Sequence, residues 1–437
     1  MSEQNKSRRK HIPKQVADIV VENEDGFDID WDSIENNVEH ANRVRRSKHR
    51  HRMSSSLQSD SIGYPTTGSN GDDKDNSSKS GTVLNHSVKI DNDKKSKKKS
   101  KGITAKKVLL IILAVILSII IGLIIAFSIL RKTGMKKLFD YNNLNIQTID
   151  DATTDNRGKT IVYNGKTYDF NPYVTSILFI GVDKETLDLV DNTVGTGGQA
   201  DALYLLAYNA TSGNVKVVSI SRDTLIDVNT YTVSGDYAGV MNTQLCLSYA
   251  YGDGKDLSAK NVLTSVRRMM FNIPINTYLA MDLKAISKMN DSIGGVRLNS
   301  MITVDDIFTE GEDVLIKGDM AEKYVRYRDT SVLDSNNNRM QRQQQYLNAF
   351  SAKLVEATKN DVTTPLKILN DSSDYLITNF DTSRVTYLAS SIIQDYSGLN
   401  IINIPGDVVE KEGKAVFIPD ETSLFETLLD IYYICRD

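Results

Sequence analysis

The apolar and polar positions divide the chain into one long apolar stretch and a later alternation of short runs. Residues 108–130 read VLLIILAVILSIIIGLIIAFSIL, without a charge or a proline. At about 1.5 Å per residue, a helix of this length crosses the ~30 Å hydrocarbon layer of a bilayer. The stretch follows 107 residues of tail, whereas the apolar core of a cleaved signal peptide lies near the N-terminus. The pattern therefore predicts an uncleaved transmembrane helix.

Three short apolar runs predict buried strands. Residues 176–183 (SILFIGVD) form the first run, and residues 202–209 and 214–221 form two more, joined by the loop ATSG. Runs this short, separated by a loop that ends in glycine, indicate a β-hairpin. The loop length predicts the antiparallel register that places Asp201 opposite Arg222.

Longer segments have the spacing of helices. Those segments are residues 241–252, 257–271, 282–295 and 339–358. Asp282 and Gly294 are suitable first and last residues for the third helix. The run KYVRYRD at residues 323–329 is β-prone and predicts a strand. Strands and helices in alternation, continued through the last 78 residues, indicate an α/β domain.

Composition divides the chain into parts with different roles. Up to Lys107 there are 22 Lys and Arg against 16 Asp and Glu, and from there on 30 against 40. The first part is rich in Ser, Asn, Asp, Lys and Gly, a composition that cannot bury enough apolar surface to fold. We therefore expect a largely disordered basic tail (1–107), the membrane helix (108–130), a polar stalk (131–174) and a folded body (175–437).

The lysines next to the apolar stretch predict its orientation. Eight of them lie between Lys94 and Lys107, just before the span. Cationic flanks stay on the cytoplasmic side, so we expect a single-pass protein of the cell membrane with a cytoplasmic N-terminus and an extracellular body. The lysine run fits contact with anionic lipid headgroups, and no nucleic-acid partner is expected from charge alone.

The body lacks the commonest catalytic and metal-binding side chains. All five histidines lie at or before His86, and the two cysteines are Cys246 and Cys435. Histidine bases and thiolate metal sites are therefore excluded from the body. Carboxylates, arginines and hydroxyl groups must carry any chemistry there, with a metal that prefers oxygen ligands.

Four arginines are concentrated in residues 325–345, VRYRDTSVLDSNNNRMQRQQQ. Arg326 and Arg328 would share one face of a strand, and Arg339 and Arg342 one face at the start of a helix. Guanidinium groups bind phosphate oxygens in pairs, so this spacing suits an anion with several oxygens. The alternative is that these arginines form ion pairs with surface carboxylates.

Several motifs, taken in order, resemble the LytR-CpsA-Psr family of cell-envelope phosphotransferases. They are ILFIGVD (177–183), QADALYLLAYN (199–209), VVSISRDT (217–224), VMNTQLCLSYAYG (240–252), DSIGGVRLN (291–299), YVRYRD (324–329) and RMQRQQQYL (339–347). The resemblance implies a mixed β-sheet sandwiched between helices, behind one transmembrane helix. It also implies the envelope of a Gram-positive type of bacterium.

The resemblance implies a reaction and a set of site residues. Such enzymes transfer a polyprenyl-pyrophosphate-linked glycopolymer, such as teichoic acid or a wall polysaccharide, to peptidoglycan through a phosphodiester. Asp183 and Asp201 match the family's Mg²⁺ ligands. The residues that match its pyrophosphate site are Arg222, Arg326, Arg328, Arg339, Arg342 and Gln343. Asp223, beside Arg222, is the candidate base or a structural partner of that arginine.

Gln199 departs from the family pattern, which has arginine two residues before the second aspartate. Gln199 is neutral, so the expected pyrophosphate site has one guanidinium fewer. Two other functions therefore stay open: a non-catalytic binder of lipid-linked polymer that acts as an envelope regulator, and a prenyl-pyrophosphate hydrolase.

Overall fold

The computed structural model describes residues 104–436, with gaps at 156, 186, 188–196, 233, 305, 330–334, 397 and 412. It also describes the backbone of two short strands, β1 (Val20–Asn23) and β2 (Gly26–Ile29), which pair antiparallel. The predicted disorder of the tail lies, apart from these strands and the first turn of the membrane helix, outside the described residues.

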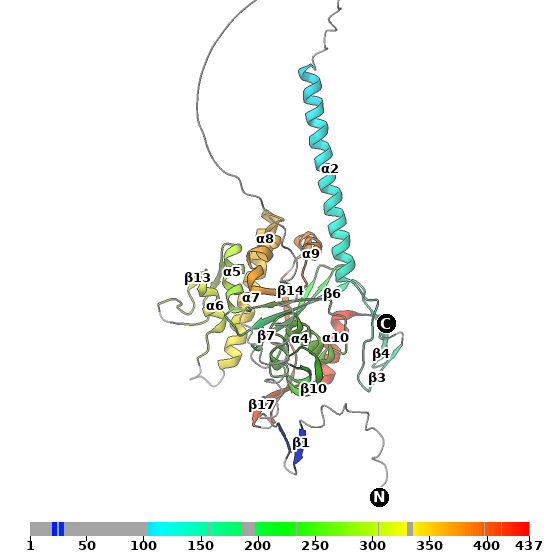
Figure 1. Cartoon of the computed structure of the whole chain (residues 1–437), viewed down its shortest axis with the longest axis vertical. Coiled ribbons are helices and arrows are strands. Elements are labelled where there is room, and N and C mark those ends of the chain that lie inside the picture. Colours follow the sequence, from blue (N-terminus) through cyan, green and yellow to red (C-terminus); the bar gives the residue numbers. More distant parts are fainter. Residues whose placement is uncertain are drawn as a thin grey trace, which may run out of the picture. The chain divides into compact units, whose positions relative to one another are not determined.

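A six-stranded mixed sheet forms the centre of the body (Figure 1). Its strands are β6 (Val174–Val182), β7 (Ala200–Asn209), β8 (Val215–Ile220), β11 (Thr277–Met281), β14 (Leu376–Thr378) and β15 (Leu399–Asn403), in the order β14-β11-β6-β7-β8-β15. The pairs β6–β7, β7–β8 and β11–β14 are antiparallel, and β6–β11 and β8–β15 are parallel.

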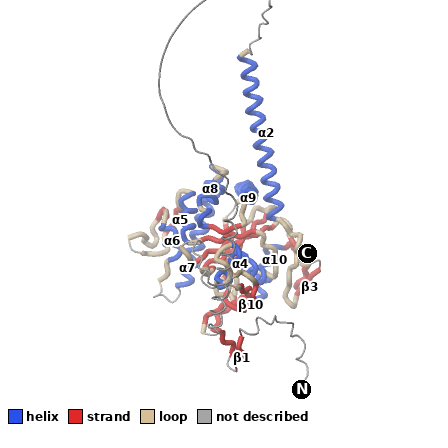
Figure 2. The backbone as a smooth tube through the Cα atoms, viewed as in Figure 1, coloured by secondary structure: helices blue, strands red, loops and turns tan. Residues whose placement is uncertain are grey.

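Helices cover both faces of this sheet, as expected from the resemblance (Figure 2). Alternate strand residues separate the faces: Leu178, Leu203 and Leu205 join the core with α4 (Asp256–Met269) and α10 (Glu421–Tyr432). Ile177, Leu206 and Val217 belong to the opposite face. That face packs against α7 (Ser335–Asn360), α8 (Thr364–Asp371) and α9 (Thr382–Asp395).

Smaller elements surround the sheet. Beside α7 lie α5 (Leu283–Ser292), β12 (Val296–Asn299), β13 (Asp313–Ile316) and α6 (Asp319–Arg326). Two hairpins lie outside the main sheet, β9 (Leu225–Tyr231) with β10 (Tyr237–Gln244) and β16 (Gly406–Lys411) with β17 (Lys414–Pro419). The short helix α3 (Leu247–Ala250) follows β10, and the 3-10 helix η1 (Ser373–Tyr375) precedes β14. A four-stranded sheet contains β3 (Ala152–Asp155), β4 (Thr160–Tyr163), β5 (Lys166–Phe170) and β18 (Tyr433–Cys435).

The apolar stretch lies within one helix, α2 (Ala105–Leu138), which is long and apolar enough to cross a membrane. The helix continues eight residues beyond the predicted span and ends against the body, where Leu138 is fully buried. Residues 131–174, predicted as a stalk, are instead part of the folded body. Leu144, Ile161 and Val174 are buried in the main core. The four-stranded sheet ties this segment to the C-terminal strand β18.

Two predicted elements differ in type. Residues 323–329, expected as a strand, are the end of helix α6 and the residues after it. Ala321, Tyr324 and Val325 are its buried residues, at helical spacing, so packing overrode the β propensity of the local sequence. Residues 241–244, expected as helix, belong to strand β10, and only the second half of that segment contains helix α3.

Replacing Ile161 by alanine tests whether this segment belongs to the core. Ile161 is fully buried, so Ile161→Ala should lower the free energy of unfolding by about 3 kcal/mol. Val162, its neighbour, is 43% exposed, and Val162→Ala should change the free energy of unfolding by less than about 1 kcal/mol. Urea unfolding of the full chain in detergent measures both. An Ile161→Ala protein as stable as the wild type would restore the stalk interpretation.

Candidate functional site

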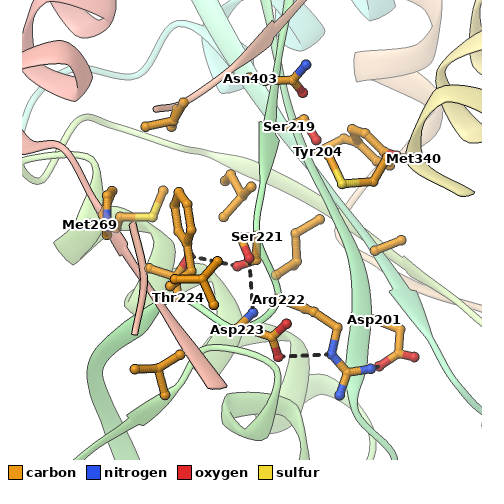
Figure 3. A pocket seen from close by; sticks show the side chains of 18 of the residues that line it. Asp201, Tyr204, Ser219, Ser221, Arg222, Asp223, Thr224, Met269, Met340 and Asn403 are labelled. Carbon is orange, nitrogen blue, oxygen red and sulfur yellow. Dashed lines mark hydrogen bonds and ion pairs between the residues drawn. The ribbon is translucent and has the colours of Figure 1, made fainter. Parts of the chain in front are cut away.

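The site is built at one end of the β7–β8 hairpin. The observed register pairs Leu203 with Ile220 and Tyr208 with Val215, as the loop length predicted. Asp201 and Arg222 are next to the end of this ladder, and the Arg222 guanidinium forms an ion pair with the Asp201 carboxylate. Figure 3 shows Arg222 between Asp201 and Asp223. The predicted cluster of Asp201, Arg222 and Asp223 at one hairpin end is confirmed.

Arg222 is held by several partners. Its Nη2 donates to Gln199 Oε1 at 2.6 Å and lies 3.7 Å from Cys246 Sγ, and its Nε lies 3.6 Å from Asp223 Oδ1. The backbone carbonyl of Arg222 accepts a hydrogen bond from the Cys246 amide at 2.9 Å. The loop after β8 is therefore fixed at both the side chain and the main chain.

Asp183 is joined to the same cluster through Gln199. The Gln199 amide donates to Asp183 Oδ1 at 2.6 Å, and the Asp183 amide donates to the Gln199 carbonyl at 3.1 Å. Gln199 thus contacts Asp183 with its backbone and Arg222 with its side chain. The neutral residue that replaces the family arginine is a bridge within the site.

A cavity of about 280 Å³ opens beside this cluster. Its lining includes Asp201, Arg222, Asp223, Arg339 and Gln343, all of them predicted site residues. Arg339 and Gln343 come from α7, which brings them across from a distant part of the sequence. The cavity therefore has guanidinium groups from two separate elements, one on each side.

The cavity lining combines two guanidinium groups, Arg222 and Arg339, with two carboxylates, Asp201 and Asp223. Burial lowers the pKa of the Arg339 guanidinium, and the charges of Arg328 and Arg222 lower it further. Burial raises the pKa of the Asp201 carboxyl, as does the negative charge of Asp183, while Arg222 opposes both. The charges of Arg222 and Arg328 thus both act on Arg339. Cations held close together in a partly buried site are arranged to receive an anion.

Two of the predicted arginines are placed elsewhere. Arg326 is the last residue of α6, its side chain is 57% exposed, and it pairs with Glu322 one turn earlier. It does not share a strand face with Arg328, because that segment is not a strand. Arg342 is buried, with hydrogen bonds to the backbone carbonyls of Tyr324, Tyr327 and Asn338. Its guanidinium joins α7 to the end of α6 instead of lining the cavity.

Sequence reasoning missed three residues of the site. Tyr204 and Asn403 line the cavity, and the Tyr204 hydroxyl donates to Gln343 Oε1 at 3.2 Å. Burial raises the pKa of Tyr204 to about 12, so it stays a hydrogen-bond donor at neutral pH. Cys246, a free and buried thiol, lies against Arg222. The polar Tyr204 within an apolar strand was the available signal.

Asp183 and Asp201 are suitable ligands for a magnesium ion whose remaining ligands would be oxygens of the substrate and water. Among the described residues no group of three or more His, Cys, Asp or Glu side chains converges as a metal site. Mg²⁺ in phosphate-handling proteins is commonly bound by one or two carboxylates, with water and phosphate oxygens supplying the other ligands. Burial raises the pKa of the Asp201 carboxyl and the negative charge of Asp183 raises it further, so a cation bound by both carboxylates would stabilise their charged forms. Their donor set is therefore suitable for Mg²⁺.

With this geometry in place, comparison with known families identifies the class of protein. The model of the LytR_cpsA_psr family matches residues 141–430. The chain belongs to this family, which confirms the resemblance and starts the domain within the segment expected as a stalk. Arg222, Asp201 and Asp183 all lie inside the matched region.

The relatives named here are teichoic acid transferases. The chain is 25% identical over 280 residues to the polyisoprenyl-teichoic acid–peptidoglycan teichoic acid transferase TagV of Bacillus subtilis, covering 62% of this chain and 65% of that protein. It is 26% identical over 237 residues to the transferase TagU of Bacillus cereus, covering 53% and 69%. The match thus spans slightly less than two thirds of TagV. The crystal structure of Bacillus subtilis TagV superposes with a TM-score of 0.47 at 21% identity, covering 59% of this chain and 94% of that one.

Replacing Gln199 by glutamate tests its contact with Arg222. The new carboxylate would lie where Oε1 is now, 2.6 Å from Arg222 Nη2, and would compete with an incoming anion. We expect Gln199→Glu to weaken binding of inorganic pyrophosphate about tenfold or more. Calorimetry on the full chain measures this. The charge-matched control Gln341→Glu, on the exposed side of α7, should change the affinity less than about twofold; equal loss in both would refute a local role for Gln199.

Replacing Arg342 or Arg326 by alanine should affect the stability of the protein to different extents, and neither change should impair pyrophosphate binding. Arg342→Ala leaves buried carbonyl groups without a donor and should lower the free energy of unfolding by about 3 kcal/mol. Arg326→Ala removes an exposed pair and should cost less than about 0.5 kcal/mol. Thermal unfolding of the full chain in detergent compares them. A stable Arg342→Ala protein with impaired pyrophosphate binding would instead place Arg342 in the site.

Proposed function

We propose that this chain is a membrane-anchored phosphotransferase that attaches a polyprenyl-pyrophosphate-linked glycopolymer to peptidoglycan through a phosphodiester. One observation carries the proposal: Arg222 and Arg339, from separate elements, line one cavity together with Asp201, and Asp183 is joined to Arg222 through Gln199. Guanidinium groups for phosphate oxygens together with carboxylates for a hard cation form a phosphoryl-transfer site. The teichoic acid transferase activity of TagV and TagU supports the same class of reaction.

The donor binds with its pyrophosphate among the arginines. Arg222 and Arg339 face the cavity from opposite elements, and Gln343 and Tyr204 form a hydrogen-bonded pair in the same lining. Asp183 and Asp201 would hold Mg²⁺, which when bound neutralises pyrophosphate charge and makes the leaving group better. Because the cavity is partly buried, these charges act with less screening than they would in water.

The transfer step uses a hydroxyl group of the peptidoglycan sugar. Its oxygen attacks the phosphorus that carries the glycopolymer, and the bond from that phosphorus to prenyl phosphate breaks. Prenyl phosphate leaves with the bond electrons, and the hydroxyl proton passes to Asp223. Asp223 is suited to this because Gln244 Nε2 fixes one of its oxygens at 2.9 Å beside Arg222. The arginines stabilise the charge that moves onto the leaving phosphate.

The isoprenoid chain of the donor has an apolar place on the same face of the sheet. A cavity of about 220 Å³ lies between β6, β7 and β11 and the helices α7, α8 and α9. Its described lining is apolar apart from Thr358, and includes Phe179, Leu206 and Leu354. Tyr204 lines the cavity that contains Arg222 and Arg339, and Leu206 lines the apolar cavity. The two residues are two positions apart on β7, so they project from one face of the sheet. Head and chain sites therefore follow each other along α7.

We place α2 across the cell membrane, with the body outside. The length and composition of α2 support the span, and the lysine run before it supports a cytoplasmic N-terminus. A lipid-linked donor is confined to the same membrane. An enzyme anchored beside it meets the donor at a high effective concentration.

Lysine substitutions at two arginines test the reaction. The full chain in proteoliposomes, with a prenyl-pyrophosphate-linked glycan, Mg²⁺ and a peptidoglycan glycan acceptor, should release prenyl phosphate only when the acceptor is present. Arg222→Lys should lower kcat about 100-fold or more, because lysine lacks the planar fork with which a guanidinium group binds two phosphate oxygens in a fixed geometry. The same change at exposed Arg326 should lower it less than about twofold.

The other outcomes identify the alternatives. Release of prenyl phosphate that does not depend on the acceptor would indicate the hydrolase. Donor binding without release, in the presence and absence of Mg²⁺, would indicate the binder. Equal loss in Arg222→Lys and Arg326→Lys would show that the cavity described here is not where transfer occurs.

A further inference from the structure

The end of α2 is packed against α9 along a continuous seam. Gly134 lies so close to α9 that a Cβ on it would come within 1.9 Å of the Ser383 carbonyl oxygen. Lys137 Nζ is 2.6 Å from Asp381 Oδ2. Leu138 is fully buried, and its carbonyl accepts from Thr175 Oγ1 at 2.9 Å. The helix is therefore joined rigidly to the body and is not a flexible tether.

The seam continues to the end of the apolar stretch. Arg131 is the first charged residue after residues 108–130. Its Nε donates to Ser390 Oγ at 3.1 Å, and its guanidinium lies over the Tyr387 ring at 5.4 Å from the centroid. Because Asp381 meets Lys137 and Ser390 meets Arg131, α9 runs antiparallel to α2. Its C-terminal half lies at the level where the apolar stretch ends.

The opposite side of α9 forms a wall of the apolar cavity. Val385, Leu388, Ala389 and Ile392 line that cavity, whereas Ser383, Tyr387 and Ser390 contact α2. One helix thus separates the membrane helix from the cavity. The cavity-lining residues Ala389 and Ile392 flank Ser390, so the cavity wall reaches the level of Arg131. Basic residues at the end of a span lie in the headgroup layer.

We propose that the α2–α9 seam holds the apolar cavity at the bilayer surface, so that the isoprenoid chain of a membrane-embedded donor enters it alongside α9 without crossing water. This inference rests on the proposed function for the identity of the lipid. The lining of this cavity, which is apolar apart from Thr358, favours a lipid chain over a soluble ligand. Moving such a chain from the bilayer into water would otherwise cost about 0.8 kcal/mol of free energy for each methylene group exposed.

Two seam variants have matched controls in the same helix. Gly134→Leu forces α2 and α9 apart, whereas an added Cβ at Gly122 meets nothing within 4 Å, so Gly122→Leu is its control. Arg131→Ala removes the contacts to Tyr387 and Ser390, and Lys132→Ala removes the same charge one residue further on. Arg131→Ala keeps the test usable if Gly134→Leu does not fold.

The assay compares two donors in proteoliposomes containing the full chain. One is a long-chain prenyl-pyrophosphate glycan in the bilayer, and the other is a water-soluble analogue with a short prenyl chain. Both seam variants should lower transfer from the bilayer donor about tenfold or more, because displacement of a bound chain by an ångström is costly. Transfer from the soluble donor should change less than about twofold. Equal loss with both donors, or no loss, would overturn the inference.

A readout without turnover separates this inference from the proposed function. A prenyl phosphate with a diazirine at the end of its chain, incorporated in phosphatidylglycerol vesicles, should label α9 in the wild type and both control variants. Labelling should be lost in Gly134→Leu and Arg131→Ala. If the wild type catalyses transfer from neither donor, the proposed function fails. The labelling result alone then tests whether the lipid chain enters the apolar cavity beside α9. Labelling of α9 that is the same in all variants would refute it.

Discussion

The ion pair between Arg222 and Asp201 depends on the register of a single hairpin. A shift of one residue in the pairing of β7 with β8 would turn every side chain of one strand to the other face. Tyr204 and Leu206 would then leave the face on which α7 packs, and Arg222 would no longer lie opposite Asp201. The tight apolar packing of both sheet faces penalises such a shift, so the core of the fold fixes the electrostatics of the site.

Features that depend on local sequence were predictable. The β7–β8 register follows from loop length, and α4, α5 and α7 follow from apolar spacing, with Asp282 capping α5 by accepting from the Ala285 amide at 2.9 Å. Residues 323–329 were not predictable in this way, because Tyr324 and Val325 favour a strand locally and a helix only once α6 packs beside α7. The same reason explains β10, whose residues 241–244 have helical spacing but pair with β9.

The residues of the site were predictable from the sequence, but the directions in which their side chains point were not. Spacing grouped Arg339 with Arg342 at one helix start, yet α7 turns the first toward the cavity and buries the second under backbone carbonyls. A turn of helix gives neighbouring faces to residues three apart, and which face meets a cavity depends on tertiary packing. Tyr204 and Cys246 were missed because their roles arise from neighbours that are distant in sequence, Gln343 and Arg222.

The arginine-lined cavity and the apolar cavity, which share strand β7 and helix α7, constrain the proposed ligand more than either does alone. Arg339 lines the first and Leu354 the second, and fifteen residues of α7 separate them, about 22 Å along the helix axis. A small phosphate ester would satisfy the arginines but leave the apolar lining in contact with water. A plain lipid chain would fill the apolar end and leave Arg222 and Arg339 without an anion. A long amphipathic molecule with its charge at one end satisfies both, and this two-part requirement favours the proposed lipid-linked donor over a soluble pyrophosphate compound.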